Sequence, residues 1–166
     1  MTGRAEGLTS DRGRGDFTLT LEELGAIFSA DRAASGVGAD DVGDPFEIVE
    51  YTRERIVGRT HTTPEHSRKG GTIAGMTIFR FFDSMAYVVT LAQSPRGTEA
   101  YTSDVTIQFL RPGPLGPFDI EARPLRFGRR ASVVGLTLSS PLVDDGPVAT
   151  GVVTYAPVFP SEGGKT

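Results

Sequence analysis

The stretch MTIFRFFDSMAYVVTLAQ (residues 76–93) decides the fold that this chain is expected to adopt. Its apolar residues occupy nearly every side of a helix, and Ser94-Pro95-Arg96-Gly97 follows as a stop signal. A helix that is hydrophobic all round must be buried on all sides. Eighteen residues at a rise of 1.5 Å give a length of about 27 Å, so the helix is predicted to cross the whole domain.

Only strand patterns follow this helix. Alternation over residues 102–110 predicts that Val105, Ile107 and Phe109 share one face of a strand. The turn residues Asp144-Asp145-Gly146 predict a hairpin before the last strand. The remaining expected features are a strand from residue 118 with inward Phe118, Ile120 and Ala122, a bulge near Pro124, a tight hairpin over residues 127–130, inward Ser132, Val134, Leu136 and Leu138, and a final strand over residues 147–159.

The chain before the helix divides into several segments. Residues 1–17 have the composition of a loose tail, because charge and glycine leave little apolar surface. Thr20-Leu21-Glu22-Glu23 matches a capping box and predicts a helix over residues 21–33, with Leu19 and Leu24 as a hydrophobic staple. A glycine-rich connection is expected over residues 33–45, one long strand over residues 46–60, and a loop over residues 61–71.

Composition limits the available chemistry. The chain has 166 residues, the length of one domain, and no cysteine, which excludes thiol nucleophiles, disulfides and cysteine-ligated metals. His61 and His66 are the only histidines and have no convincing third ligand, so we expect no metal site. A net charge of −4 argues against nucleic-acid binding, which needs a basic surface. Catalysis must therefore rest on carboxylates, hydroxyls, arginines or the backbone.

The sequence favours a cytoplasmic location. The first 18 residues are polar and glycine-rich and lack the apolar segment of a signal peptide. The most apolar window, residues 73–92, carries Arg80 and Asp83, each of which costs about 2.5–3.5 kcal/mol at a bilayer centre. We therefore expect neither a membrane span nor a membrane partner.

The predicted order of strand, long helix and four antiparallel strands resembles the hotdog fold. This is an α+β fold in which a curved antiparallel β-sheet wraps around one long central α-helix. Over residues 46–158 the chain resembles acyl-CoA thioesterases of the hotdog superfamily, the PaaI-like group in particular. The family motif is His-Gly-Gly at the start of the central helix, with an acidic residue seven positions past the second glycine. Ala74-Gly75-Met76 stands where His-Gly-Gly would be, and Asp83 occupies the acidic position.

Many relatives carry a GGT-x-x-GP-T variant, which Gly70-Gly71-Thr72 with Gly75 and Thr77 resembles closely. The resemblance implies an enzyme that hydrolyses an acyl-CoA thioester to a carboxylate and a free thiol. It needs no cofactor, because coenzyme A is part of the substrate. Negative charge develops on the thioester oxygen, and the first N–H groups of a helix point outward without an internal acceptor.

The amides of Gly75 and Met76 are therefore the predicted oxyanion hole, and Asp83 is the predicted nucleophile or general base. Thr102 aligns with a hydroxyl residue that orients the catalytic water in related enzymes. Asp83 lies two turns past Gly75 and cannot reach the same helix end. In the family two subunits pack with antiparallel central helices, so the resemblance implies a homodimer with shared active sites. Pairing of dimers into a homotetramer stays open.

Arginines are the predicted contacts for the polar parts of the substrate. Arg68 stands six residues before Ala74, where many relatives have an asparagine that binds substrate or water. It is therefore included among the predicted catalytic residues, where its guanidinium can contact an acyl carboxylate or a phosphate. The family binds coenzyme A phosphates near hairpins, and guanidinium groups suit phosphate oxygens. The predicted coenzyme A contacts are Arg111, Arg126, Arg129 and Arg130.

Alternatives remain for the site and for the function. Asp83 is also placed for an i, i+3 ion pair with Arg80. The missing histidine and Met76 in place of glycine motivate a non-catalytic acyl-CoA-binding or structural hotdog dimer. A hotdog hydratase is disfavoured, because those relatives pair a histidine with an acid. The predicted division of the chain is a tail (1–17), an N-terminal helix and linker (18–45), a hotdog domain (46–160) and a second tail (161–166).

Overall fold

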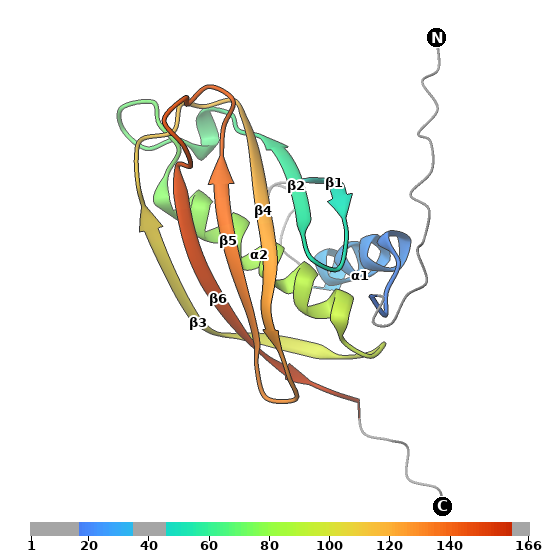
Figure 1. The fold of residues 1–166 in the computed structure, drawn as a ribbon. Helices are drawn as coiled ribbons and strands as arrows, with labels where there is room; N and C mark the ends of the chain where they lie inside the picture. Colours follow the sequence, from blue (N-terminus) through green and yellow to red (C-terminus); the bar gives the residue numbers. More distant parts are fainter. Residues whose placement is uncertain (1–16, 35–45, 161–166) are drawn as a thin grey trace, which may run out of the picture.

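The computed structural model describes residues 17–34 and 46–160. A six-stranded antiparallel sheet, in the order β1-β2-β4-β5-β6-β3, curves around one long helix, α2 (Figure 1). This arrangement confirms the predicted α+β hotdog fold. The elements in chain order are α1 (Leu21–Ala34), β1 (Glu47–Tyr51), β2 (Ile56–His61), the 3₁₀ helix η1 (Pro64–His66), α2 (Gly75–Gln93), β3 (Glu99–Phe109), β4 (Pro117–Phe127), β5 (Ser132–Ser139) and β6 (Ala149–Val158).

Helix α2 begins and ends within one residue of the predicted bounds. The helix packs against the inner face of the sheet through its buried side chains Phe81, Phe82 and Met85. On the sheet, β4 contributes buried Phe118 and Ile120 to the same core. Full burial of one such side chain stabilises the fold by about 1.5–3 kcal/mol. Within residues 17–34 and 46–160, no helix is long and apolar enough to span a bilayer.

The prediction that α2 is buried on all sides is wrong for the single chain. Gly75, Met76 and Phe79 are exposed, and Arg80 and Asp83 are half-buried. These positions follow one another at helical spacing and therefore form one stripe along the helix. The reason is geometric, because a single curved sheet covers one side of a helix and leaves the opposite side uncovered. We call this set of five residues the open stripe of α2.

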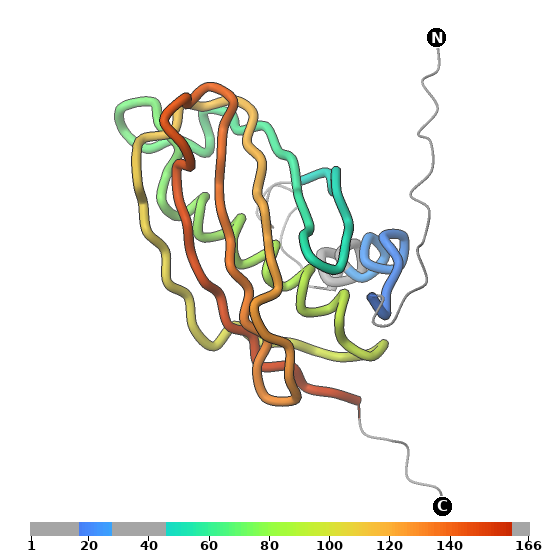
Figure 2. Tube along the Cα trace, in the orientation of Figure 1, coloured from blue at the N-terminus to red at the C-terminus, as the bar shows by residue number. Residues whose placement is uncertain are grey.

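The predicted long strand over residues 46–60 is also wrong, because two strands form there. The polar segment between β1 and β2 reverses the chain into a hairpin (Figure 2). The N–H of Thr52 donates to the carbonyl of Arg55 at 2.9 Å, and the N–H of Arg55 donates to Thr52 Oγ1 at 3.1 Å. Side-chain hydrogen bonds of this kind let threonine end a strand. The sheet therefore has six strands instead of about five.

The four strands after α2 form as predicted. The β4–β5 ladder shifts register between Pro124 and Arg126, which confirms the bulge, and the Gly128 N–H closes the tight hairpin on the Ala131 carbonyl at 3.0 Å. Phe109 of β3 pairs with buried Ala149 of β6, yet 60% of its surface is exposed because β3 is an edge strand. The predicted inward residues of β4 and β5 are buried: Phe118, Ile120, Ala122, Ser132, Val134, Leu136 and Leu138.

The N-terminal segment packs against the end of α2. The Thr20 N–H donates to the Glu23 carboxylate at 2.8 Å and the Glu23 N–H donates to Thr20 Oγ1 at 3.2 Å, which confirms the capping box. Leu19 and Leu24 are both buried in the core. Residues 1–16, 35–45 and 161–166 lie outside the described residues, so the division into tails, linker and domain stays a prediction.

Gly151 of β6 provides a test of how closely β3, β6 and α2 pack. A Cβ added at Gly151 would lie 2.6 Å from the Thr106 carbonyl oxygen and 3.0 Å from the Phe82 ring. Neither neighbour can move easily, because Thr106 is held by backbone pairing with β6 and the Phe82 ring is fully buried. We expect Gly151→Ala to lower the free energy of unfolding by about 1–3 kcal/mol, as measured by urea denaturation.

Gly25 in α1 is the matched control for this substitution, because a Cβ there would meet nothing within 4 Å. Gly25→Ala should leave the free energy of unfolding unchanged or raise it by up to about 1 kcal/mol. Equal effects of the two substitutions would contradict the close packing at Gly151.

Candidate active site

Asp83 lies in the third turn of α2 and accepts hydrogen bonds from two hydroxyl groups. Thr102 Oγ1 donates to Asp83 Oδ1 at 2.7 Å, and the Tyr155 hydroxyl donates to the same oxygen at 2.8 Å. An ionised carboxylate can only accept, so both hydroxyl groups must be the donors. The structure thus brings together the two predicted residues Asp83 and Thr102 and adds Tyr155.

Neighbouring strands set the positions of the two hydroxyl residues. Tyr155 of β6 pairs with Thr102 of β3 on one side and with Ser132 of β5 on the other. The β3–β6 ladder shifts register between Thr102 and Asp104, directly after Thr102. A bulge changes the direction of nearby side chains, and Thr102, the residue directly before this one, donates to the carboxylate of Asp83 on α2.

Tyr155 is the member of the cluster that the sequence analysis missed. Only 4% of the Tyr155 residue is exposed, and its ring centre lies 5.7 Å from that of Tyr87. Burial raises the pKa of the Tyr155 phenol well above its usual range, and the nearby Asp83 carboxylate acts in the same direction, while the Thr102 hydroxyl acts in the opposite direction. The phenol therefore stays protonated near neutral pH and acts as a donor.

The start of α2 forms a second polar feature. The amides of Gly75 and Met76 meet no acceptor among the described residues, whereas the N–H groups of Thr77 and Ile78 donate to the Ala74 carbonyl at 3.0 and 3.2 Å. Gly75 and Met76 are exposed, so their outward amides are accessible. Gly75 and Asp83 lie two turns, about 12 Å, apart along the axis, so one chain does not bring the two predicted functions together.

The absence of a side chain at Gly75 allows the Phe109 ring to pack closely against the start of α2. A Cβ added there would lie 3.3 Å from the exposed Phe109 ring of β3. The helix start is therefore bordered by an aromatic ring on one side and is open on the other.

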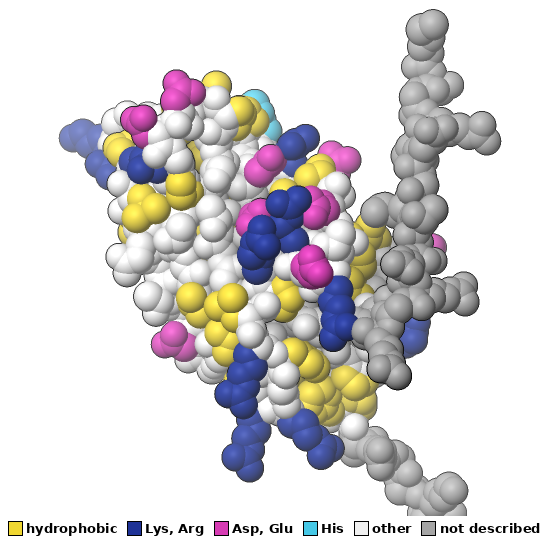
Figure 3. Space-filling model, viewed as in Figure 1, with side chains coloured by type: hydrophobic (Ala, Val, Ile, Leu, Met, Phe, Trp, Pro, Cys, Tyr) yellow, Lys and Arg dark blue, Asp and Glu magenta, His cyan; other side chains and the backbone are white. Residues whose placement is uncertain are grey.

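The predicted arginines fall into two groups at opposite ends of the sheet. Arg126, Arg129 and Arg130 are exposed around the β4–β5 hairpin, at the end of the sheet where β5 begins beside Tyr155. Figure 3 shows basic side chains at the lower end of the molecule, where Figure 1 draws this hairpin.

Arg111 and Arg68 belong to the other end, near the start of α2. Arg111 Nη1 donates to the Pro147 carbonyl in the β5–β6 connection. Arg68 is exposed in the loop before α2, which touches the segment after Arg111 through an isolated bridge between Thr72 and Pro114. The four predicted coenzyme A contacts therefore do not form a single patch on one chain.

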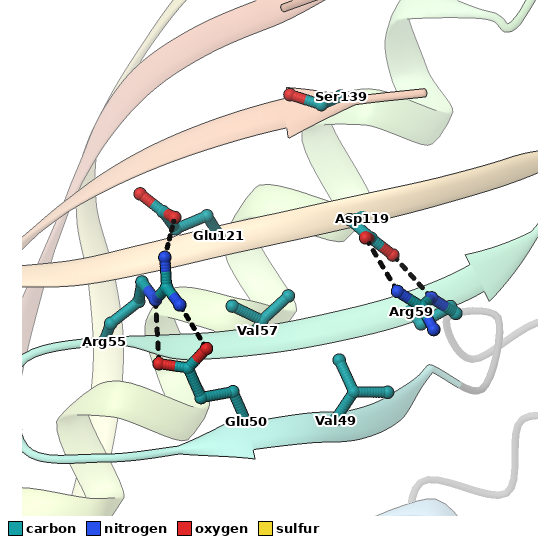
Figure 4. Close-up of a pocket in the computed structure, with 8 residues that line it drawn as sticks. All are labelled: Val49, Glu50, Arg55, Val57, Arg59, Asp119, Glu121 and Ser139. Atoms are coloured by element: carbon teal, nitrogen blue, oxygen red, sulfur yellow. Dashed lines mark hydrogen bonds and ion pairs between the residues drawn. The ribbon is translucent and has the colours of Figure 1, made fainter. Parts of the chain in front are cut away.

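A groove on the outer face of the sheet lies apart from this site (Figure 4). Arg55 is paired with Glu50 and, at 3.1 Å, with Glu121, while Arg59 holds Asp119 at 2.8 and 3.0 Å. The Arg55 side chain lowers the pKa of Glu50 through its hydrogen bonds. Since these charges satisfy one another, we assign the groove no catalytic role. Its lining is Val49, Glu50, Arg55, Val57, Arg59, Asp119, Glu121 and Ser139.

Within the part of the chain that the structure describes, no group of three or more His, Asp or Glu side chains could hold a metal ion. His66 has a local structural contact, because its Nδ1 accepts a hydrogen bond from the Thr63 N–H at 2.8 Å at the start of η1.

A known family matches part of the chain. The sequence pattern of the acyl-CoA thioesterase N-terminal domain matches residues 84–156, which is less than half of the chain. The match contains Thr102 and Tyr155 and begins one residue after Asp83. No curated protein matches the chain.

Solved structures share the fold over most of the chain. A candidate thioesterase from a Silicibacter species is 26% identical with a TM-score of 0.71, covering 87% of this chain and 96% of that one. Zebrafish thioesterase superfamily member 2 is 24% identical with a TM-score of 0.70, covering 84% and 99%. A Streptococcus mutans protein bound to acetyl-CoA is 22% identical with a TM-score of 0.64, covering 75% and 97%. The family match and these structures together support a place for the chain in the hotdog thioesterase superfamily.

Buried Tyr155 and half-buried Tyr51 make the free energy of unfolding fall at alkaline pH. Burial raises the pKa of both Tyr155 and Tyr51 above the ordinary value of about 10. A group with a raised pKa in the folded state stabilises the fold fully below its unfolded pKa, and this stabilisation is lost as the pH rises. We expect phenolate absorbance to show that Tyr51 and Tyr155 ionise only as the protein unfolds.

Replacing both tyrosines with phenylalanine should flatten the fall in the free energy of unfolding above pH about 10. An equally steep fall in the double variant would contradict the assignment of this pH dependence to these two phenols.

Proposed function

We propose that this chain is an acyl-CoA thioesterase of the PaaI-like group, acting in the cytoplasm. The observation that carries the proposal is the Asp83 carboxylate, which is half-buried on the open stripe of α2 and held by Thr102 and Tyr155. The match to the acyl-CoA thioesterase domain and the acetyl-CoA bound to the Streptococcus mutans relative support the substrate class.

The proposed reaction uses Asp83 on water or directly on the thioester. As a general base, Asp83 takes a proton while the water oxygen bonds to the carbonyl carbon; the carbon–sulfur bond then breaks and the thiolate leaves with a proton. As a nucleophile, the carboxylate attacks the same carbon and the carbon–sulfur bond breaks, so that the thiolate leaves with a proton and the acyl group is joined to Asp83 as an anhydride. Water then hydrolyses the anhydride in a second step, which releases the carboxylic acid and restores the Asp83 carboxylate. Thr102 is exposed beside Asp83 and orients the water in either route.

The proposed oxyanion hole consists of the Gly75 and Met76 amides of a second copy. Because these amides and Asp83 are about 12 Å apart on one helix, a single thioester cannot contact both. Antiparallel packing of two α2 helices removes this separation. Met76, Phe79 and Phe109 are 70%, 36% and 60% exposed, and a second copy would bury them.

The proposed coenzyme A contacts are the hairpin arginines and Arg111. Arg126, Arg129 and Arg130 are exposed on a projecting hairpin and free to face phosphate oxygens. Arg111 and Arg68 lie near the helix start, so in the dimer they would approach the thioester from the subunit that supplies the amides.

Asp83→Asn tests the catalytic carboxylate. The amide keeps the shape of the side chain but can neither accept the proton nor attack, so kcat should fall by about 10²- to 10⁴-fold. Thiol release from a panel of acyl-CoA substrates measures the effect. Asp119→Asn is the matched control, because Asp119 lies on the outer face in an ion pair with Arg59, and it should keep the activity of the unchanged protein.

Turnover that survives Asp83→Asn would show that another group is the base. Coenzyme A binding by the unchanged protein without any turnover across the panel would replace the proposal with the alternative of a non-catalytic acyl-CoA-binding dimer.

Mixing two inactive variants tests the shared site. Met76→Pro removes one amide donor in the first helical turn, where proline is tolerated, and Met76→Ala is the control that keeps the amide. Random exchange of Met76→Pro with Asp83→Asn subunits makes half of the dimers mixed, and each mixed dimer has one intact site, so about a quarter of full activity should return.

Activity that never exceeds the sum of the two variants would contradict a site built from two subunits. Light scattering on the same samples measures the mass and distinguishes a monomer, a dimer and a dimer of dimers.

A further inference from the structure

We infer that Tyr155 is a positioning residue that, together with Thr102, holds Oδ1 of Asp83 and leaves Oδ2 to act on water or on the thioester. The inference rests on the proposed thioesterase function and adds a residue to it. It also separates the two oxygens of the carboxylate, which the sequence cannot distinguish.

The hydrogen bonds carry the first step of this inference. Both hydrogen bonds end on Oδ1, at 2.7 Å from Thr102 and 2.8 Å from Tyr155. Among the described residues, none donates a hydrogen bond to Oδ2. The Tyr155 hydroxyl also lies 3.2 Å from the Asp83 backbone carbonyl oxygen. Rotation of the carboxylate would break both short bonds at once, so its orientation is fixed by the pair.

The surroundings of Tyr155 carry the second step. Its backbone is paired on both sides, its ring packs beside Tyr87, and only 4% of the residue is exposed. Such a side chain has little freedom to move, so it transmits the rigidity of the sheet to the carboxylate. Burial also keeps the phenol protonated and therefore donating.

The difference in exposure gives the third step. Tyr155 is buried, Asp83 is half-buried and Thr102 is exposed. Exposure therefore increases from the phenol through the carboxylate to Thr102, so we place the approach of water and substrate on the side away from the phenol. Tyr155 acts on the substrate only through Asp83, whereas Thr102 can also contact the catalytic water. A misplaced reacting group lowers the rate of the chemical step far more than it weakens substrate binding.

Tyr155→Phe tests the inference, because it removes the hydroxyl and keeps the ring. We expect kcat to fall by about 10- to 100-fold while KM stays within about threefold. Tyr51→Phe is the matched control: Tyr51 is another tyrosine with a raised pKa, and its hydroxyl donates to the Leu19 carbonyl at 2.8 Å, away from Asp83. It should leave kcat unchanged, and thermal unfolding of both variants checks that each is folded.

A double-mutant cycle separates positioning from a general structural effect. If Tyr155 acts through Asp83, Tyr155→Phe should cause no further loss of kcat in an Asp83→Asn background. Thr102→Ser, which keeps the second donor, should retain most activity, and Thr102→Val should lower kcat as Tyr155→Phe does.

The possible outcomes are distinguishable. An unchanged kcat in Tyr155→Phe, or an equal loss with and without Asp83→Asn, would overturn the role of Tyr155 and leave the thioesterase proposal standing. If the unchanged protein is folded but hydrolyses no acyl-CoA, both the role of Tyr155 and the thioesterase proposal are overturned.

Discussion

The burial of α2 by a single curved sheet is the constraint on which the rest of this structure depends. The helix supplies many of the large buried side chains, yet a one-layer sheet can cover only the side that faces it. The strand order follows from this wrapping, with β3 and β1 at the two edges. One stripe of the helix stays uncovered, and it carries Asp83 and the Gly75 and Met76 amides that are proposed for the chemistry.

An ionised carboxylate on so apolar a helix needs donors, because an unpaired buried charge destabilises a fold strongly. Here the donors are Thr102 of the edge strand β3 and Tyr155 of β6, the strand next to it. The same two hydroxyl groups satisfy Asp83 and fix its direction, so the polar cluster serves stability and the proposed chemistry together. This dual use explains why a hydroxyl-bearing aromatic residue occupies an inward position that an apolar residue would otherwise fill.

The two faces of the sheet carry different kinds of residues. Charges on the outer face of β1, β2 and β4 are paired across strands, as in Arg55 with Glu50 and Glu121, and exposed pairs of this kind contribute little to stability. The inner face holds the core and the Asp83 cluster. The arginines proposed for coenzyme A lie at the ends of the sheet, beyond both faces, where a long ligand can run along the edge of the domain.

Local patterns in the sequence determined the bounds of α2, the capping box at Thr20, the bulge near Pro124 and the hairpin at Gly128, because each depends on neighbours within a few residues. Residue spacing together with family resemblance also singled out Asp83 and Thr102. Tertiary structure alone decided the β1–β2 hairpin within an apparently continuous strand and the uncovered stripe of α2. It also decided the partner of Tyr155, which lies 72 residues from Asp83 along the chain. A buried tyrosine in a strand predicts that its hydroxyl has some partner. Which partner it meets depends on how β6, β3 and α2 pack, and no local pattern encodes that contact.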